Sequence, residues 1–210
     1  MLGGPRVARA AAAAIALMVW LGLVVQFDAS LDLIGSAGGA LWVMLRYFTV
    51  IANLLVALVL TRIAFSGWAS TSPELTGCVT LAIVLVGVVY GLLLRGLLEL
   101  SGGAKLANFI LHVAAPILVP LFWLLFAPKG GLRRRDPWLW AILPAAYFAY
   151  ALVRGGMEGV YAYPFLNVAR IGWGRTVVTG LLMAAAFIVA GFMLVWLDSH
   201  LARRARAQSG

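Results

Sequence analysis

A threonine and a histidine, each inside a long apolar stretch, are the residues of this chain best suited to chemistry. Thr49 lies in the apolar run 41–65 and His112 in the run 106–127. A threonine hydroxyl is a weak nucleophile until a neighbouring base takes its proton, and a neutral imidazole within hydrogen-bonding distance can act as that base. This pair of residue types indicates acyl transfer, provided that the fold brings them together.

Each of the two residues belongs to a polar stripe that the helical repeat places on one face. Arg46, Thr49 and Asn53 are spaced i, i+3, i+7, and Asn108 and His112 are spaced i, i+4. Polar side chains are costly in hydrocarbon unless they face protein, so we expect the two stripes to face each other. A rise of about 1.5 Å per residue from the outer face places both Thr49 and His112 in the outer half of the membrane.

Other polar side chains are expected in the same layer. We assign supporting or substrate-binding roles to Arg46, Asn53, Tyr90, Asn108, Tyr150, Arg170 and Arg175. An arginine among them could stabilise a developing oxyanion or hold a carboxylate head group. No acidic residue falls at comparable depth on any span, so an amide, a tyrosine or water would have to orient the imidazole. Spacing alone leaves a structural alternative open, because a buried threonine commonly bonds its own backbone carbonyl at i−4.

The composition places these residues in a membrane. Of the 210 residues, 64% are hydrophobic and only 11% are charged, and the mean hydropathy is +1.02, whereas soluble domains keep about a quarter of their residues charged. The net charge of +9 is not a nucleic-acid patch, since the basic residues sit at the ends of apolar runs. The single cysteine, Cys78, excludes an intrachain disulfide, and with two histidines it excludes a Cys/His zinc cluster. We expect no metal and no cofactor.

Six apolar runs predict an all-α bundle of six transmembrane helices that forms a single domain, 1–210. The spans are about 7–27, 41–65, 75–94, 106–127, 138–153 and 172–197. Ten Lys and Arg residues fall on the side of the termini and five on the opposite side, so the positive-inside rule predicts that both termini are cytoplasmic. Gly87 and Gly91, spaced i, i+4, should allow close helix packing.

Two segments have alternative interpretations. The first span, with Arg6 and Arg9 before an alanine-rich run, also has features of a secretory signal. The segment 155–171 is too polar to span and too aromatic for a free loop. It is either a lid over a pocket or an aromatic belt at the outer interface, and Glu158 within it is expected to be solvated.

The polar residues occur in motifs that resemble a known family. The sequences Arg46-Tyr-Phe-Thr49-Val-Ile-Ala-Asn53, Ala107-Asn108-Phe-Ile-Leu-His112 with Pro116, and 161–170 resemble the six-span bacterial membrane proteins related to the animal androgen-induced and androgen-dependent TFPI-regulating proteins. The resemblance covers most of the chain from the second span to the sixth. Animal members are threonine hydrolases that cleave fatty acid esters of hydroxy fatty acids with one membrane-embedded Thr and one His.

The resemblance implies that Thr49 is the nucleophile, that His112 is the base and that the partners are lipid ester substrates and membrane lipids. It also implies an integral protein of a bacterial inner membrane. The alternative is a non-catalytic lipid-binding or scaffold protein with the same buried polar cluster. A transporter would need charged groups or broken helices at the midplane, and a bis-histidine haem protein would need a second histidine at suitable depth, whereas His200 lies at the other end of the sixth span.

Overall fold

The computed structural model describes residues 4–97 and 99–207, and this part of the chain is all-α. The helices are α1 (Pro5–Ile34), α2 (Ala37–Met44), α3 (Phe48–Ser66), η1 (Trp68–Ser70), α4 (Pro73–Val89), η2 (Tyr90–Leu94), α5 (Gly102–Phe109), η3 (Ile110–Ala114), α6 (Ala115–Phe126), α7 (Asp136–Trp140), α8 (Ile142–Glu158), η4 (Pro164–Leu166) and α9 (Val168–Ala207). The short elements η1 and η4 are 3₁₀-helices, and η2 and η3 are π-helices.

Five helical segments are long and apolar enough to cross a membrane. They are Pro5–Ile34, Phe48–Ser66, Pro73–Leu94, Gly102–Phe126 and Val168–Ala207. The chain therefore has the character of an integral membrane protein. The predicted span 138–153 falls on α7 and α8, which are not among these five, so the sixth span and the orientation of the termini remain predictions.

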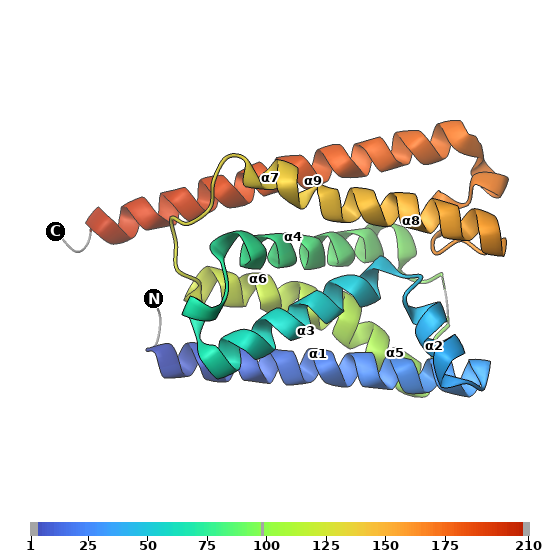
Figure 1. The fold of residues 1–210 in the computed structure, drawn as a ribbon, viewed down its shortest axis with the longest axis horizontal. Coiled ribbons are helices and arrows are strands. Elements are labelled where there is room, and N and C mark those ends of the chain that lie inside the picture. Colours follow the sequence, from blue (N-terminus) through green and yellow to red (C-terminus); the bar gives the residue numbers. More distant parts are fainter. Residues whose placement is uncertain (1–3, 98, 208–210) are drawn as a thin grey trace.

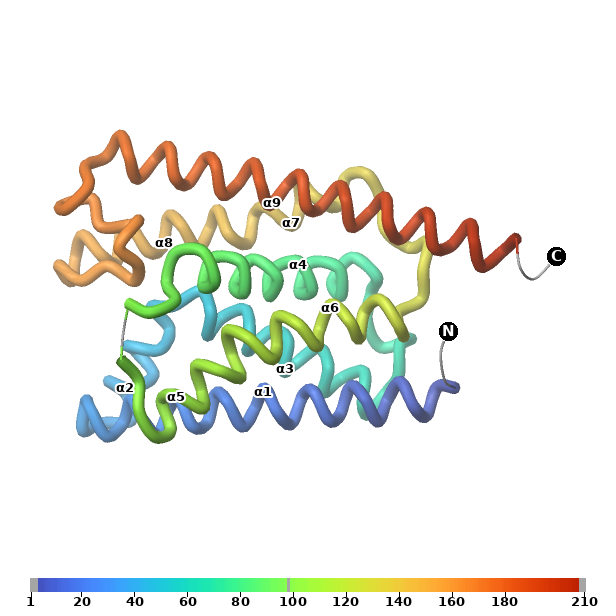
Figure 2. Tube along the Cα trace, turned by 180° about the vertical axis from the view of Figure 1, so that it is seen from behind, coloured from blue at the N-terminus to red at the C-terminus, as the bar shows by residue number. Residues whose placement is uncertain are grey.

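The helices form a bundle with α8 and α9 side by side along one side of α4 (Figures 1 and 2). Below them α4 packs against α3 and α6, and α1 packs against α3 and α5. Helix α1 begins and α9 ends at the same end of the bundle (Figure 1). The opposite end, which we call the α2 end, carries α2 and the connection from α8 to α9.

Local sequence signals set several helix boundaries. Pro5 begins α1, where its missing N–H is not needed, and Gly35 ends the helix with a φ of 76°. The Ser72 hydroxyl caps α4 by accepting from the Leu75 N–H. Gly172, at φ 79°, kinks α9 near its start, which is where the predicted sixth span begins.

Helices α4 and α6 come close together at Gly87. A Cβ atom added there would lie 2.6 Å from Cβ of Pro116, whereas a Cβ added at Gly91 would meet no heavy atom within 4 Å. The small-residue spacing thus allows close packing at the first glycine only. This contact holds α4 directly against the segment that carries His112, because Pro116 follows η3 by two residues.

We predict that Gly87→Ala destabilises the protein and that Gly91→Ala does not. The added methyl group at position 87 has to displace a rigid proline ring, and overpacking of this kind costs about 1–3 kcal/mol. At position 91 the methyl group meets open space and removes the conformational freedom of glycine from the unfolded chain. Thermal unfolding of both variants in one detergent checks the prediction, and equal stability of the two would contradict it.

Candidate functional site

The predicted second span is broken immediately before Thr49. Helix α2 ends at Met44 and α3 begins at Phe48, and Tyr47 between them has an extended backbone with φ −102° and ψ 130°. The prediction of one continuous helical stripe was therefore wrong for Arg46, which lies in the break and not on the face of α3 that carries Thr49 and Asn53.

The backbone carbonyls freed by this break accept hydrogen bonds from α8. The Tyr147 hydroxyl donates to the Arg46 carbonyl at 2.7 Å, and the Tyr150 hydroxyl donates to the Leu45 carbonyl at 3.2 Å. Arg154 donates to the Trp42 carbonyl at 2.6 Å. Unpaired carbonyls are costly away from water, so α8 makes the break possible. Tyr150 supports the site in this way and does not line the cavity described below.

The structure brings the Thr49 hydroxyl and the His112 imidazole into contact. Oγ1 of Thr49 lies 3.1 Å from Nε2 of His112, and Nδ1 of the same ring lies 3.3 Å from the Asn108 carbonyl oxygen. A carbonyl can only accept, so Nδ1 carries the proton and Nε2 presents its lone pair to the threonine. The hydroxyl therefore donates to the imidazole, which is the arrangement required for general-base activation.

Backbone irregularity and amide side chains hold this pair in place. His112 lies in the π-helix η3, just before Pro116, and segments of this kind leave carbonyls without their usual helical partner. The Asn53 amide, fully buried, donates to the Leu111 carbonyl at 3.1 Å and to the Thr49 carbonyl at 2.9 Å. Asn53 thus joins the two helices directly beside the pair.

Tyr90 and Asn108 support the imidazole from the other side. The Asn108 amide donates to the Tyr90 hydroxyl at 2.8 Å, and the Tyr90 ring lies 4.6 Å from the His112 ring between centroids. Tyr90 begins the π-helix η2 at the end of α4. Both predicted residues are therefore brought to the site, where they confine the ring.

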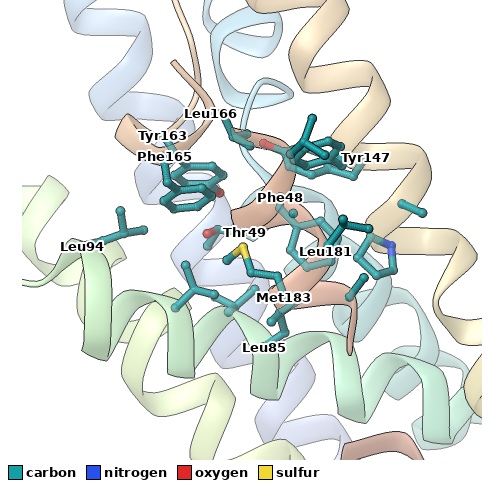
Figure 3. Close-up of a pocket in the computed structure, with 18 residues that line it drawn as sticks. Phe48, Thr49, Leu85, Leu94, Tyr147, Tyr163, Phe165, Leu166, Leu181 and Met183 are labelled. Carbon is teal, nitrogen blue, oxygen red and sulfur yellow. The ribbon is translucent and has the colours of Figure 1, made fainter. Parts of the chain in front are cut away.

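An apolar cavity of about 260 Å³ opens beside Thr49. Figure 3 shows the side chains around it, with the Thr49 hydroxyl on its wall. It is lined by Phe48, Thr49, Leu85, Val86, Val89, Leu94, Pro144, Ala145, Tyr147, Phe148, Tyr163, Phe165, Leu166, Val177, Gly180, Leu181, Met183 and Ala184. No charged side chain is among them. Carbon-rich walls and a few hydroxyl groups suit an acyl chain whose polar group lies at the threonine.

The segment between α8 and α9 closes part of this cavity. Tyr163 and Leu166 are buried, and the Tyr163 ring stacks on Phe165 with centroids 5.1 Å apart. Both rings line the cavity (Figure 3). This placement favours the first of the two interpretations of the segment, a lid over the cavity, and not the second, an aromatic belt at the interface.

The arginines predicted at the site do not reach Thr49 and His112. Arg46 bonds Glu158 at 2.7 Å, and Arg154 bonds the same carboxylate at 2.7 Å. Arg170 and Arg175 are exposed and do not line the cavity. Glu158, which was expected to be solvated, keeps 21% of its side chain exposed and also accepts from the Trp42 indole at 2.8 Å. Among the described residues, no group of three or more His, Cys, Asp and Glu is placed to hold a metal ion.

Sequence reasoning missed the importance of Glu158 and Tyr163. Spacing within one helix cannot reveal either residue, since Trp42 and Arg46, which bond Glu158, lie more than a hundred positions earlier in the chain. Tyr47, whose ring contacts that of Tyr163, is equally distant in the sequence. An i, i+4 arrangement of Arg154 and Glu158 is the one local signal.

We predict that the ion pairs of Glu158 stabilise the α2 end at neutral pH and that this stabilisation is lost in acid. Hydrogen bonds from Arg154 and Arg46 lower the pKa of this carboxyl below its ordinary value. A lowered pKa in the folded state means that the stabilisation is present above the ordinary glutamate pKa and is lost as the pH falls through the lowered pKa. Thermal unfolding measured against pH should show an acid-dependent component that Glu158→Gln removes. Glu99→Gln is the control: Glu99 is exposed and lies between η2 and α5, so this variant should retain the acid-dependent component. Equal pH profiles of the wild type and both variants would contradict the prediction.

The assembled groups can do one kind of chemistry. A hydroxyl that donates to a correctly oriented imidazole, on the wall of a cavity for apolar chains, can attack an acyl carbonyl. Comparison of the chain with protein-family models, with curated proteins and with solved structures finds no match.

Proposed function

We propose that the protein is an intramembrane threonine hydrolase of lipid esters. The observation that carries the proposal is the 3.1 Å contact between Thr49 Oγ1 and His112 Nε2 at the wall of an apolar cavity. The motif resemblance to bacterial relatives of the animal hydrolases of fatty acid esters of hydroxy fatty acids supports the same two residues. The proposed setting is a six-span bundle in a bacterial inner membrane with both termini in the cytoplasm.

The proposed reaction has two halves. Oγ1 of Thr49 attacks the ester carbonyl while Nε2 of His112 takes the hydroxyl proton, and the imidazolium then gives that proton to the departing alcohol. Water, activated by the same imidazole, hydrolyses the acyl-threonine and returns the free hydroxyl. The Asn108 carbonyl holds the imidazole in the required tautomer throughout, in place of the carboxylate of a serine-protease triad.

The cavity supports an ester with at least one long apolar chain. Its lining contains three hydroxyl side chains, those of Thr49, Tyr147 and Tyr163, and no cation. The arginines nearest to the break, Arg46 and Arg154, already share Glu158. The protein would therefore recognise the apolar acyl chain and the ester carbonyl of the substrate. A free carboxylate on the substrate would have to remain outside this cavity.

A non-catalytic lipid-binding protein is the second candidate, and the apolar lining of the cavity favours it equally. The two candidates differ at Thr49. The Leu45 carbonyl at i−4 lies in the break and accepts from Tyr150, so the Thr49 hydroxyl donates to the imidazole. A binding protein would use this contact to join two helices, whereas a hydrolase would use it to activate the hydroxyl. Turnover separates them.

We predict that Thr49→Ala and His112→Ala each reduce kcat for lipid ester hydrolysis by about 10³-fold or more, because nucleophile and base act as a unit. The double variant should be little worse than either single one. Thr76→Ala is the matched control: Thr76 is also buried in a candidate span, and its hydroxyl donates within its own helix turn. Purified proteins are assayed with a fatty acid ester of a hydroxy fatty acid and with a neutral long-chain ester.

Wild-type turnover in Thr49→Ala would refute the threonine mechanism. Binding of the esters to the wild type without any turnover would favour the lipid-binding alternative. Hydrolysis of the neutral ester alone would restrict the substrate class to uncharged esters.

A further inference from the structure

Tyr163 lines the wall of the cavity together with Thr49. It is 8% exposed, and its ring is held by stacking on Phe165 and by an edge contact with Tyr47 at 5.9 Å between centroids. The ring also lies 6.4 Å from that of Tyr147 between centroids. In Figure 3 the Tyr163 ring, stacked with Phe165, points toward Thr49.

The first turn of α3 adds donors at the same point. No side chain caps this helix, although the first N–H groups of any helix lack intrahelical partners. Tyr163 lines the cavity together with Thr49, which belongs to this first turn. A phenol hydroxyl in that position can donate its proton to an acceptor at the threonine. The positive end of the α3 dipole favours negative charge there.

We propose that the Tyr163 hydroxyl donates a hydrogen bond to the oxyanion that forms when Thr49 attacks an ester. This inference rests on the proposed function. Attack forms the bond between Oγ1 and the carbonyl carbon, and the π electron pair moves to the carbonyl oxygen. The threonine proton passes to His112, while Tyr163 keeps its own proton and stabilises the new charge. Collapse restores the carbonyl, and the alcohol leaves with the proton from His112.

The other polar side chains around the pair either donate elsewhere or do not line the cavity. The Tyr147 hydroxyl donates its proton to the Arg46 carbonyl. The Tyr90 hydroxyl bonds Asn108 and does not line the cavity. Asn53 donates to two backbone carbonyls. Arg46 and Arg154 bond Glu158, and neither lines the cavity, although Nε of Arg46 is buried without a hydrogen-bond partner. Tyr163 is the donor that both lines the cavity and faces the attacking oxygen.

Tyr163→Phe tests the proposal, because it removes the hydroxyl and keeps the ring that packs on Phe165. Removal of one oxyanion donor reduces kcat by about 10²–10³-fold, and KM should stay near its wild-type value. Tyr161→Phe is the matched control: it changes a tyrosine of the same segment whose ring packs against Gly155 and which does not line the cavity. Its kcat should equal that of the wild type.

A thionoester substrate separates a hydrogen bond to the oxyanion from a purely structural role. Sulfur accepts hydrogen bonds poorly, so the wild type should hydrolyse the oxygen ester much faster than the thionoester, and Tyr163→Phe should lose most of this preference. Wild-type kcat in Tyr163→Phe, or an unchanged ratio of the two substrates, would overturn the inference. The proposed function fails instead if Thr49→Ala hydrolyses the ester as fast as the wild type does.

Discussion

The architecture of this protein depends on hydrogen bonds to the backbone carbonyls that are left unpaired where a helix is interrupted. A helix can cross hydrocarbon because all its N–H and C=O groups pair within it, and any interruption has to be satisfied by other protein groups. In the last turn of α2 and in the break that follows it, the carbonyls of Trp42, Leu45 and Arg46 accept from Arg154, Tyr150 and Tyr147 of α8. The interruption is thus fixed by a helix about a hundred residues further along the chain.

The same rule shapes the histidine side of the site. The π-helix η3 and Pro116 release carbonyls in the fourth apolar run, and Asn53 donates to one of them at Leu111. Both members of the reacting pair therefore stand on irregular backbone that specific side chains stabilise. In the proposed mechanism this arrangement has a catalytic benefit, since it holds the hydroxyl 3.1 Å from the imidazole nitrogen that takes its proton.

Helix faces and depth were sufficient to predict part of the site. The i, i+4 spacing of Asn108 and His112, together with their depth relative to Thr49, predicted the contact that is observed. Arg46 escaped prediction because Leu45-Arg46-Tyr47 contains neither glycine nor proline and gives no sign of a break. Glu158 and Tyr163 escaped because their contacts are long-range: the order in which helices pack, not the local sequence, brings the end of α8 to the break. The all-α class followed from the composition and from the length of the apolar runs. The predicted span 138–153 is divided between the short helices α7 and α8, which are not among the five helical segments long and apolar enough to cross a membrane.

Peptide mapping of the wild-type protein after reaction with a fluorophosphonate tests the central claim most directly, because such a reagent forms a stable covalent adduct with an activated hydroxyl. Mass spectrometry should locate the adduct on Thr49, and replacement of His112 by alanine should slow its formation. An adduct on a different residue, or a chain that remains unmodified while it hydrolyses ester, would contradict the assignment of Thr49 as the nucleophile.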